Sequence, residues 1–252
     1  MSEQIFYILL YVWIGIAFLL FPLLLNMVVP YGRHSNKNWG PMINNKFGWI
    51  IMELPVILIF TALFFLGPVP KTWPILLLYG VFILHYINRI FIFPIQIKGR
   101  HKQMPMIIAI SAMGFIFFNG FFNGYWFGYL SAGYDDSWFS DWRFVSGLIL
   151  FVAGILTNIV SDQKLIRLRS GGETGYYVPY GGLFNYISSP NLFGEILEWF
   201  GWALMCWCLP SLSFAIWTFA NLVPRAINHH KWYKQNFENY PTDRKAVIPF
   251  II

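Results

Sequence analysis

The chain has 252 residues, of which 57% are hydrophobic, 21% aromatic and only 11% charged, with a formal net charge of +6. A soluble globular domain carries about 25% charged residues, so this composition excludes an ordinary soluble protein and predicts one integral membrane domain over residues 1–252. The two cysteines, Cys206 and Cys208, are too close in sequence for an ordinary disulfide and lack the second pair that a zinc site needs.

The chain contains seven apolar runs long enough to cross a bilayer, which takes about 20 residues. The N-terminal run lacks a basic segment and a cleavage site, so we expect it to be a retained helix. The sequence therefore predicts an all-α integral membrane protein with seven transmembrane helices. Their expected ranges are 5–29, 47–66, 74–97, 105–130, 142–160, 192–209 and 211–227.

The basic residues predict how the helices are oriented. Fourteen of the 17 Lys and Arg residues fall in segments 31–46, 98–104 and 161–190 and in the C-terminal tail. Seven spans put all four segments on one side, so the positive-inside rule predicts a cytoplasmic C-terminus and an N-terminus outside. Topology and anionic lipid account for the positive charge, so no nucleic-acid partner is predicted. We interpret Lys37, Lys98 and Lys102 as interface anchors.

Ionisable side chains occur inside the predicted spans, where they are costly and usually mark a site. Glu53 lies in the apolar run GWIIMELPVILIF of the second span. The stretch LHYINR places His85, Tyr86 and Arg89 in the third span. Glu53 and Arg89 could form a simple buried ion pair, but the number of polar groups favours a functional site.

Later spans add amide and acidic groups at helical spacing. Asn119 and Asn123 share a face of the fourth span, either as interhelical hydrogen-bonding groups or as part of a site. Asn191 and Glu195, one turn apart, also share a face. The adjacent imidazoles at 229 and 230 point different ways on a helix, so no metal site is predicted.

The segment 170–190, SGGETGYYVPYGGLFNYISSP, is long for a connection and rich in Gly, Tyr and Ser. Long loops of this kind are usually functional, and this one could close over a ligand at the cytoplasmic face. It lacks a GxGxxG motif and a surrounding βαβ pattern, which excludes a Rossmann domain. A dinucleotide would therefore bind among helices and loops, with Arg and Asn side chains holding its phosphates.

Five motifs together resemble the steroid 5α-reductase family. They are MELP, LHYINR, SDQKLIRLR, PYGGLFNYISSPNLFGEILEW and the C-terminal PRAINHHKWYKQNFENYPTDRKAVIPFII. Their order and spacing match the family from about residue 30 to 252. Where relatives often carry Gln before the glutamate of the second span, this chain has Met52.

The resemblance implies a seven-span enzyme that uses NADPH to reduce the 4,5 double bond of a 3-oxo-4-ene steroid. It implies that Glu53 and Tyr86 contact the steroid carbonyl, and that residues 158–252 form most of the cofactor site. The implied cofactor contacts are Asn158, Asp162, Arg169, Tyr176, Asn191, Glu195, Arg225, His229, Tyr233 and Arg244. For the substrate pocket we expect Met52, Arg89, Phe115, Phe118 and Asn119.

The chemistry of these residues fits such a reaction. Hydride addition to the β-carbon of an enone moves negative charge onto the carbonyl oxygen, which then needs hydrogen-bond donors. A carboxyl group in apolar surroundings keeps its proton and can donate, and a tyrosine hydroxyl is a second donor. The membrane would supply an apolar, steroid-like substrate, and no metal or obligate protein partner is predicted.

Three alternatives remain open at this stage. A reductase of a polyprenol, enoyl lipid or other apolar enone would use similar cofactor groups with a different apolar pocket. An isoprenyl-cysteine-methyltransferase-like enzyme would bind S-adenosylmethionine instead. A transporter is disfavoured because no inverted repeat is visible. The sequence predicts a multi-pass protein of either a bacterial inner membrane or the endoplasmic reticulum.

Overall fold

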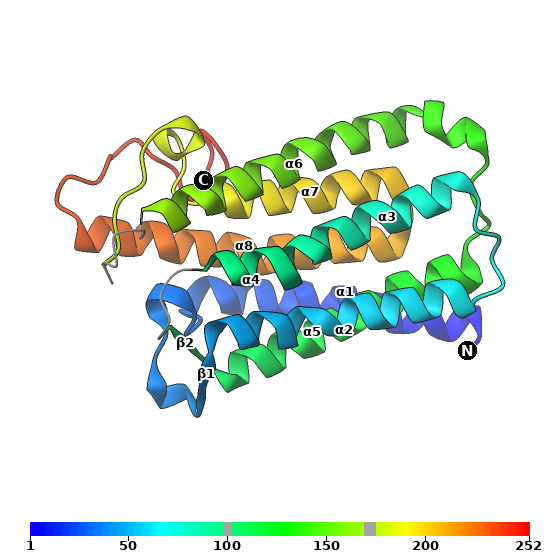
Figure 1. Ribbon diagram of the computed structural model, residues 1–252, viewed down its shortest axis with the longest axis horizontal. Coiled ribbons are helices and arrows are strands. Elements are labelled where there is room, and N and C mark those ends of the chain that lie inside the picture. Colours follow the sequence, from blue (N-terminus) through cyan, green and yellow to red (C-terminus); the bar gives the residue numbers. More distant parts are fainter. Residues whose placement is uncertain (98–101, 169–174) are drawn as a thin grey trace.

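The computed structural model describes residues 1–97, 102–168 and 175–252, and within them the chain is a bundle of long helices (Figure 1). A π-helical turn, Asn88–Ile92, joins α3 to α4, and a second one, Trp126–Leu130, continues α5. The bounds are α1 Glu3–Asn26, β1 Met42–Asn44, α2 Asn45–Leu66, α3 Trp73–Ile87, α4 Phe93–Gln96, β2 Gln103–Pro105, α5 Met106–Tyr125, α6 Trp142–Arg167, α7 Pro190–Cys206 and α8 Leu209–Asn236.

Local chemistry explains where several helices begin. The side chains of Asn44 and Asp141 accept hydrogen bonds from backbone N–H groups in the first turns of α2 and α6, at 2.9 and 2.8 Å. Helices α3, α7 and α8 carry a proline in the first turn, where its missing N–H costs no hydrogen bond. Helix α2 runs without a break through Pro55, so the proline after Glu53 does not end the helix.

Five helical segments of the described chain are long and apolar enough to cross a membrane, so the chain is a helical membrane protein. They are Glu3–Asn26, Asn45–Leu66, Trp73–Gln96, Met106–Leu130 and Trp142–Arg167. Helix α7, with 17 residues, is shorter than these five. Two predicted boundaries are wrong. The fifth helix ends at Arg167 rather than near 160, and α8 continues to Asn236 rather than ending near 227, because polar residues extend both helices beyond their apolar runs.

Helices α6 and α7 lie side by side (Figure 1), and glycines bring their backbones into contact. A Cβ atom on Gly154 would lie 2.3 Å from the backbone nitrogen of Glu198, and one on Gly194 would lie 2.5 Å from that of Asn158. Only a hydrogen atom fits at these two positions. The close approach places the polar residues of α6 directly against those of α7.

The core of the bundle is aromatic. Phe60, Phe82, Trp199 and Trp202 are almost completely buried, and the rings of Phe60 and Phe82 stack with their centroids 4.3 Å apart. Trp199 also packs on the ring of Phe214 in α8, at 4.2 Å. Trp199 and Phe214 also line the cavity described below, so the rest of this cluster packs behind one wall of the candidate site.

The basic segments gather at one end of the bundle, opposite the N-terminus (Figure 1). Strands β1 and β2 pair antiparallel there, joining the segment before α2 to the segment before α5. The Arg33 guanidinium donates a hydrogen bond to the Tyr233 hydroxyl at 3.0 Å, and the Ser188 hydroxyl donates to the Lys245 carbonyl at 2.9 Å. The four segments predicted to lie on one side therefore contact one another in their described parts.

Candidate active site

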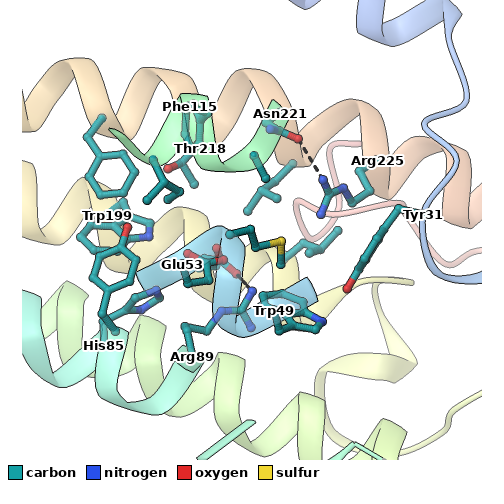
Figure 2. Close-up of a pocket in the computed structure, with 18 of the residues that line it drawn as sticks. Tyr31, Trp49, Glu53, His85, Arg89, Phe115, Trp199, Thr218, Asn221 and Arg225 are labelled. Atoms are coloured by element: carbon teal, nitrogen blue, oxygen red, sulfur yellow. Dashed lines mark hydrogen bonds and ion pairs between the residues drawn. The ribbon is translucent and has the colours of Figure 1, made fainter. Parts of the chain in front are cut away.

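A cavity lies among α2, α3, α5, α7 and α8, and we call it the central cavity (Figure 2). The empty space in it, with the open mouth included, is about 760 Å³. One part of the wall is apolar, with Trp49, Met52, Phe115, Trp199 and Phe214. The other part is polar, with Tyr31, Glu53, His85, Tyr86, Arg89, Glu195, Thr218, Asn221 and Arg225.

Glu53 on α2 and Tyr86 on α3 both line the central cavity. Within the described part of the chain, neither the Glu53 carboxyl group nor the Tyr86 hydroxyl makes a hydrogen bond or ion pair with another residue. Tyr86 is 1% exposed, and its ring packs 4.9 Å from that of Phe82, which fixes its orientation. The side chains of Glu53 and Tyr86 are thus available for hydrogen bonding to a molecule in this cavity.

Arg89 does not pair with Glu53. Its guanidinium lies 3.4 Å from Oδ2 of Asp162 and 3.2 Å from Oε2 of Glu195, and it also packs 4.4 Å from the centroid of the Trp49 ring. The π-helical turn that begins at Asn88 carries this side chain, and such turns are frequent at functional sites. The simple ion-pair interpretation of Glu53 and Arg89 is therefore wrong.

The amide and acidic residues of α6 and α7 form one hydrogen-bond network. The Asn158 amide donates to the Asn191 carbonyl at 2.9 Å and to Oε2 of Glu195 at 3.4 Å. The Asn191 amide donates to Oδ1 of Asp162 at 2.9 Å. The structure therefore brings four predicted cofactor residues together and links them to Arg89.

A second cavity, which we call the basic cavity, adjoins the central cavity at the end where the basic segments gather. Its volume is about 1000 Å³ with its mouth included, and the two cavities share Tyr31 and Trp49. The residues that give it its character are Arg33, Lys102, Asp162, Tyr176 and His229.

Arg33 is the most enclosed cation of the basic cavity. Its guanidinium lies 4.2 Å from the ring centroid of Tyr233, 4.7 Å from that of Trp232 and 5.2 Å from that of Tyr176. One of its terminal nitrogens is buried and has no hydrogen-bond partner. A cation held by aromatic faces with an unused donor is suited to an anionic ligand.

Burial sets the charge of the groups around Arg33. It raises the pKa of the Tyr31 hydroxyl and lowers the pKa of His34, which the positive charge of Arg33 lowers further. Burial and then the Arg33 charge also hold the pKa of His229 well below its ordinary value. The rings of His34 and His229 stack 5.9 Å apart. Both imidazoles are neutral at physiological pH, so arginine and lysine carry the positive charge here.

Two further arginines have donors without partners. Arg225 donates from one terminal nitrogen to the Asn221 side chain at 3.2 Å, while its Nε is buried and unpaired (Figure 2). Arg244 is 2% exposed, and among the described residues none of its three guanidinium nitrogens has a partner at hydrogen-bond geometry. Buried charged donors are normally paired, so these groups fit the phosphates of a dinucleotide. Arg244 lies beside the Tyr180 and Tyr240 rings, outside the walls of both cavities.

The structure separates three expected substrate-pocket residues. Phe115 lines the central cavity, but Phe118 and Asn119 are not among the residues of its wall. Phe118 points away from the cavity, 43% exposed and packed on Trp13 with ring centroids 4.8 Å apart. The Asn119 amide donates to the Phe115 carbonyl of its own helix, and the Asn123 amide donates to the Asn119 carbonyl. The amide groups of both asparagines therefore donate hydrogen bonds to backbone carbonyls of their own helix.

One other expectation changed, and two fall outside the described residues. Lys102, interpreted as an interface anchor, lines the basic cavity and lies 5.8 Å from the Tyr176 ring centroid. Arg169 and Lys98 lie outside the described residues. Sequence reasoning missed Tyr31, Arg33 and Trp49, because nothing in their local sequence distinguishes them from loop or interface residues. Their local sequence offers only aromatic and basic residues close together, a pattern that loop and interface segments also show.

The fold and the site define a helical membrane protein with a buried polar site beside a basic cavity. Comparison with known proteins identifies the class. The family profile described as 3-oxo-5-alpha-steroid 4-dehydrogenase matches residues 102–252. The chain is 40% identical to steroid 5-alpha-reductase DET2 of Solanum lycopersicum, over 99% of this chain and 98% of the relative. It is 41% identical to 3-oxo-5-alpha-steroid 4-dehydrogenase 1 of Bos taurus, over 88% of each chain.

The chain therefore belongs to the 3-oxo-5-alpha-steroid 4-dehydrogenase family, also called the steroid 5-alpha-reductases. This confirms the family that the sequence motifs indicated. The membership identifies the chain as an oxidoreductase related to steroid metabolism, and its five apolar helical segments agree with an integral membrane enzyme.

Proposed function

We propose that this protein reduces the 4,5 double bond of a 3-oxo-4-ene steroid to the 5α-reduced 3-oxosteroid, with NADPH as hydride donor. The observation that carries the proposal is the pair of side chains, Glu53 and Tyr86, that line a partly apolar cavity. The family membership and the activities for which the relatives are named support the reaction class. A reductase of another apolar enone, a polyprenol or an enoyl lipid remains the second candidate.

Our mechanism assigns the polarising step to Glu53 and Tyr86. When bound, NADPH supplies the hydride. As the β-carbon of the enone receives it, the carbonyl oxygen becomes negative, and the Glu53 carboxyl group and Tyr86 hydroxyl donate hydrogen bonds to that oxygen. Removal of one such donor typically lowers the rate by about 10²–10³. The apolar wall formed by Phe115, Trp199 and Phe214 excludes water and so strengthens both hydrogen bonds.

For NADPH we assign the phosphate-binding role to Arg33, Arg225 and Arg244, whose unpaired donors support it. The network of Asn158, Asp162, Asn191 and Glu195 would hold the part of the cofactor nearest the central cavity. Tyr176, His229 and Tyr233 would contact the part in the basic cavity. In this proposal the chain is a single domain, and its residues 158–252 form most of the cofactor site.

We also propose seven spans, with α7 and the first part of α8 as the last two. In this topology the basic end of the bundle faces the cytoplasm and the N-terminus lies outside. The clustering of the basic segments at one end supports it. An apolar substrate would then enter from the bilayer, in a bacterial inner membrane or the endoplasmic reticulum, without a metal or an obligate protein partner.

The test uses the purified full-length chain in detergent with NADPH and progesterone, followed by mass spectrometry. We expect the 5α-reduced product, with Glu53→Leu and Tyr86→Phe, which each remove one donor, slower by about 10²–10³. Replacing Arg244 with Leu should weaken NADPH binding about 10- to 150-fold, the equivalent of one charge-assisted hydrogen bond of about 1.5–3 kcal/mol. The exposed neighbour Lys245→Gln is the matched control. Activity undiminished in both donor variants would contradict the mechanism.

A further inference from the structure

A histidine–carboxylate pair lies next to the proposed donors and has no role in the mechanism so far. Nδ1 of His85 and Oε1 of Glu198 are 2.7 Å apart, joining α3 to α7. His85 is 3% exposed and Glu198 is 0% exposed. Ionisable groups at this depth are rare in membrane helices and usually have a functional role.

The surroundings of Glu198 require the pair to hold a proton between its two members. The second carboxyl oxygen, Oε2, is buried and has no hydrogen-bond partner. A carboxylate beside a neutral imidazole would be an uncompensated buried charge, which is strongly unfavourable. With one shared proton, on either the carboxyl group or the ring, the pair has no net charge.

His85 also reaches the central cavity. Its ring lines the cavity together with Glu53 and Tyr86, and its centroid lies 5.0 Å from the Tyr86 ring and 4.6 Å from the Trp199 ring. Glu198 occupies Nδ1, which directs the other ring nitrogen away from that bond. His85 is therefore a proton donor with a second proton stored behind it, in the wall of the site.

We propose that His85 delivers the proton that completes the reduction, and that Glu198 is the positioning residue that replenishes it. This inference rests on the proposed function. After hydride addition, the substrate is an enolate. Its electron pair takes the proton from Nε2 of His85, so that the C–H bond at the α-carbon forms and the C=O bond is restored.

The charges balance within the pair. As the Nε2–H bond breaks, the shared proton settles on Nδ1, which leaves a neutral imidazole and the Glu198 carboxylate; this buried charge replaces that of the enolate and lasts only until a proton returns. After the product leaves, water entering the cavity returns one proton to Nε2. Each turnover thus consumes one hydride and one proton, without any additional reactant.

The first test needs no cofactor. The full-length protein is incubated in D₂O with a 5α-reduced 3-oxosteroid, and mass spectrometry follows deuterium entering the α-carbon between the carbonyl and the reduced carbon. We expect exchange with the parent chain and a loss of about 10²-fold or more in Glu198→Gln, typical of a lost acid–base group. The glutamine still donates a hydrogen bond to Nδ1 but stores no transferable proton. Glu198→Asp should restore part of the exchange.

Two controls separate proton transfer from a structural role. Glu3→Gln makes the same chemical change at an exposed position and should exchange like the parent. Equilibrium binding of the steroid to Glu198→Gln should be unchanged, since the hydrogen bond to His85 is kept. If Glu198→Gln does not fold, His85→Gln replaces it in the same assays.

Exchange at the parent rate in Glu198→Gln, or no exchange in the parent, would overturn the inference. So would a loss of steroid affinity as large as the loss of exchange. Failure of the proposed function looks different. The parent would exchange deuterium but form no 5α-reduced product when NADPH is added, which would keep the proton donor and reject the reduction.

Discussion

Replacing Arg89 with Met tests the charge balance on which the site depends. The change removes the cation that lies between Asp162 and Glu195 and leaves both carboxylates buried without it. The side chains of these residues are at most 15% exposed, so solvent compensates little. Removal of one partner from a buried pair typically costs about 3–5 kcal/mol. We expect the free energy of unfolding in detergent to fall by about that amount.

A compensating variant makes this prediction sharper. Adding Asp162→Asn and Glu195→Gln to Arg89→Met removes the unpaired charges and should restore most of the lost stability, because amides of the same size fill the same space. The assay is denaturant unfolding of the purified chain, followed by tryptophan fluorescence. An Arg89→Met protein as stable as the parent, or a triple variant less stable than the single one, would refute the reasoning.

Three further predictions test packing, the pocket and pH. Gly154→Ala forces α6 away from α7, so we expect a loss of about 1–3 kcal/mol in unfolding experiments together with weaker NADPH binding. Phe115→Ala should raise the steroid KM about tenfold or more, whereas Phe118→Ala should leave it unchanged. Burial, followed by neighbouring positive charges, lowers the pKa of His230 to about 4, so the folded state favours the neutral ring. The contribution of His230 to the free energy of unfolding is therefore fully present above pH 6.5, and it is lost as the pH drops from 6.5 towards 4.

A specific experimental result would contradict each of these three predictions. Parent-like stability of Gly154→Ala would show that the two helices can separate without cost. Equal KM values for the two phenylalanine variants would place the substrate elsewhere. The thermal midpoint of His230→Gln should depend less on pH between 6.5 and 4 than that of the parent, and identical pH profiles would contradict the assignment.

Local sequence was sufficient for some features of the site and not for others. Helical spacing correctly predicted that Asn191 and Glu195 share a face, because the 3.6-residue period is a local property. The same period could not distinguish Phe115 from Phe118, because the rotation of α5 against its neighbours depends on tertiary packing. The hydropathy of the third span located Tyr86 and Arg89 but not the π-helical turn between α3 and α4 that carries Arg89.

Long-range pairing explains the remaining misses. Arg33 contacts Tyr233, 200 positions further along the chain, and His85 contacts Glu198, 113 positions away. No single window of sequence contains such a pair. The charge pattern did place Arg33 at the correct end of the bundle, but topology alone could not separate a ligand-facing arginine from an interface anchor.

The most direct test of the central claim follows the hydride itself. The purified chain is given progesterone and NADPH that carries deuterium at the transferable position of its nicotinamide C4, and the product is analysed by mass spectrometry and NMR. We predict one deuterium at the β-carbon of a 5α-reduced 3-oxosteroid, with none delivered by Glu53→Leu on the same timescale. A reduced product without the label, or no reduction despite bound NADPH and steroid, would contradict the account.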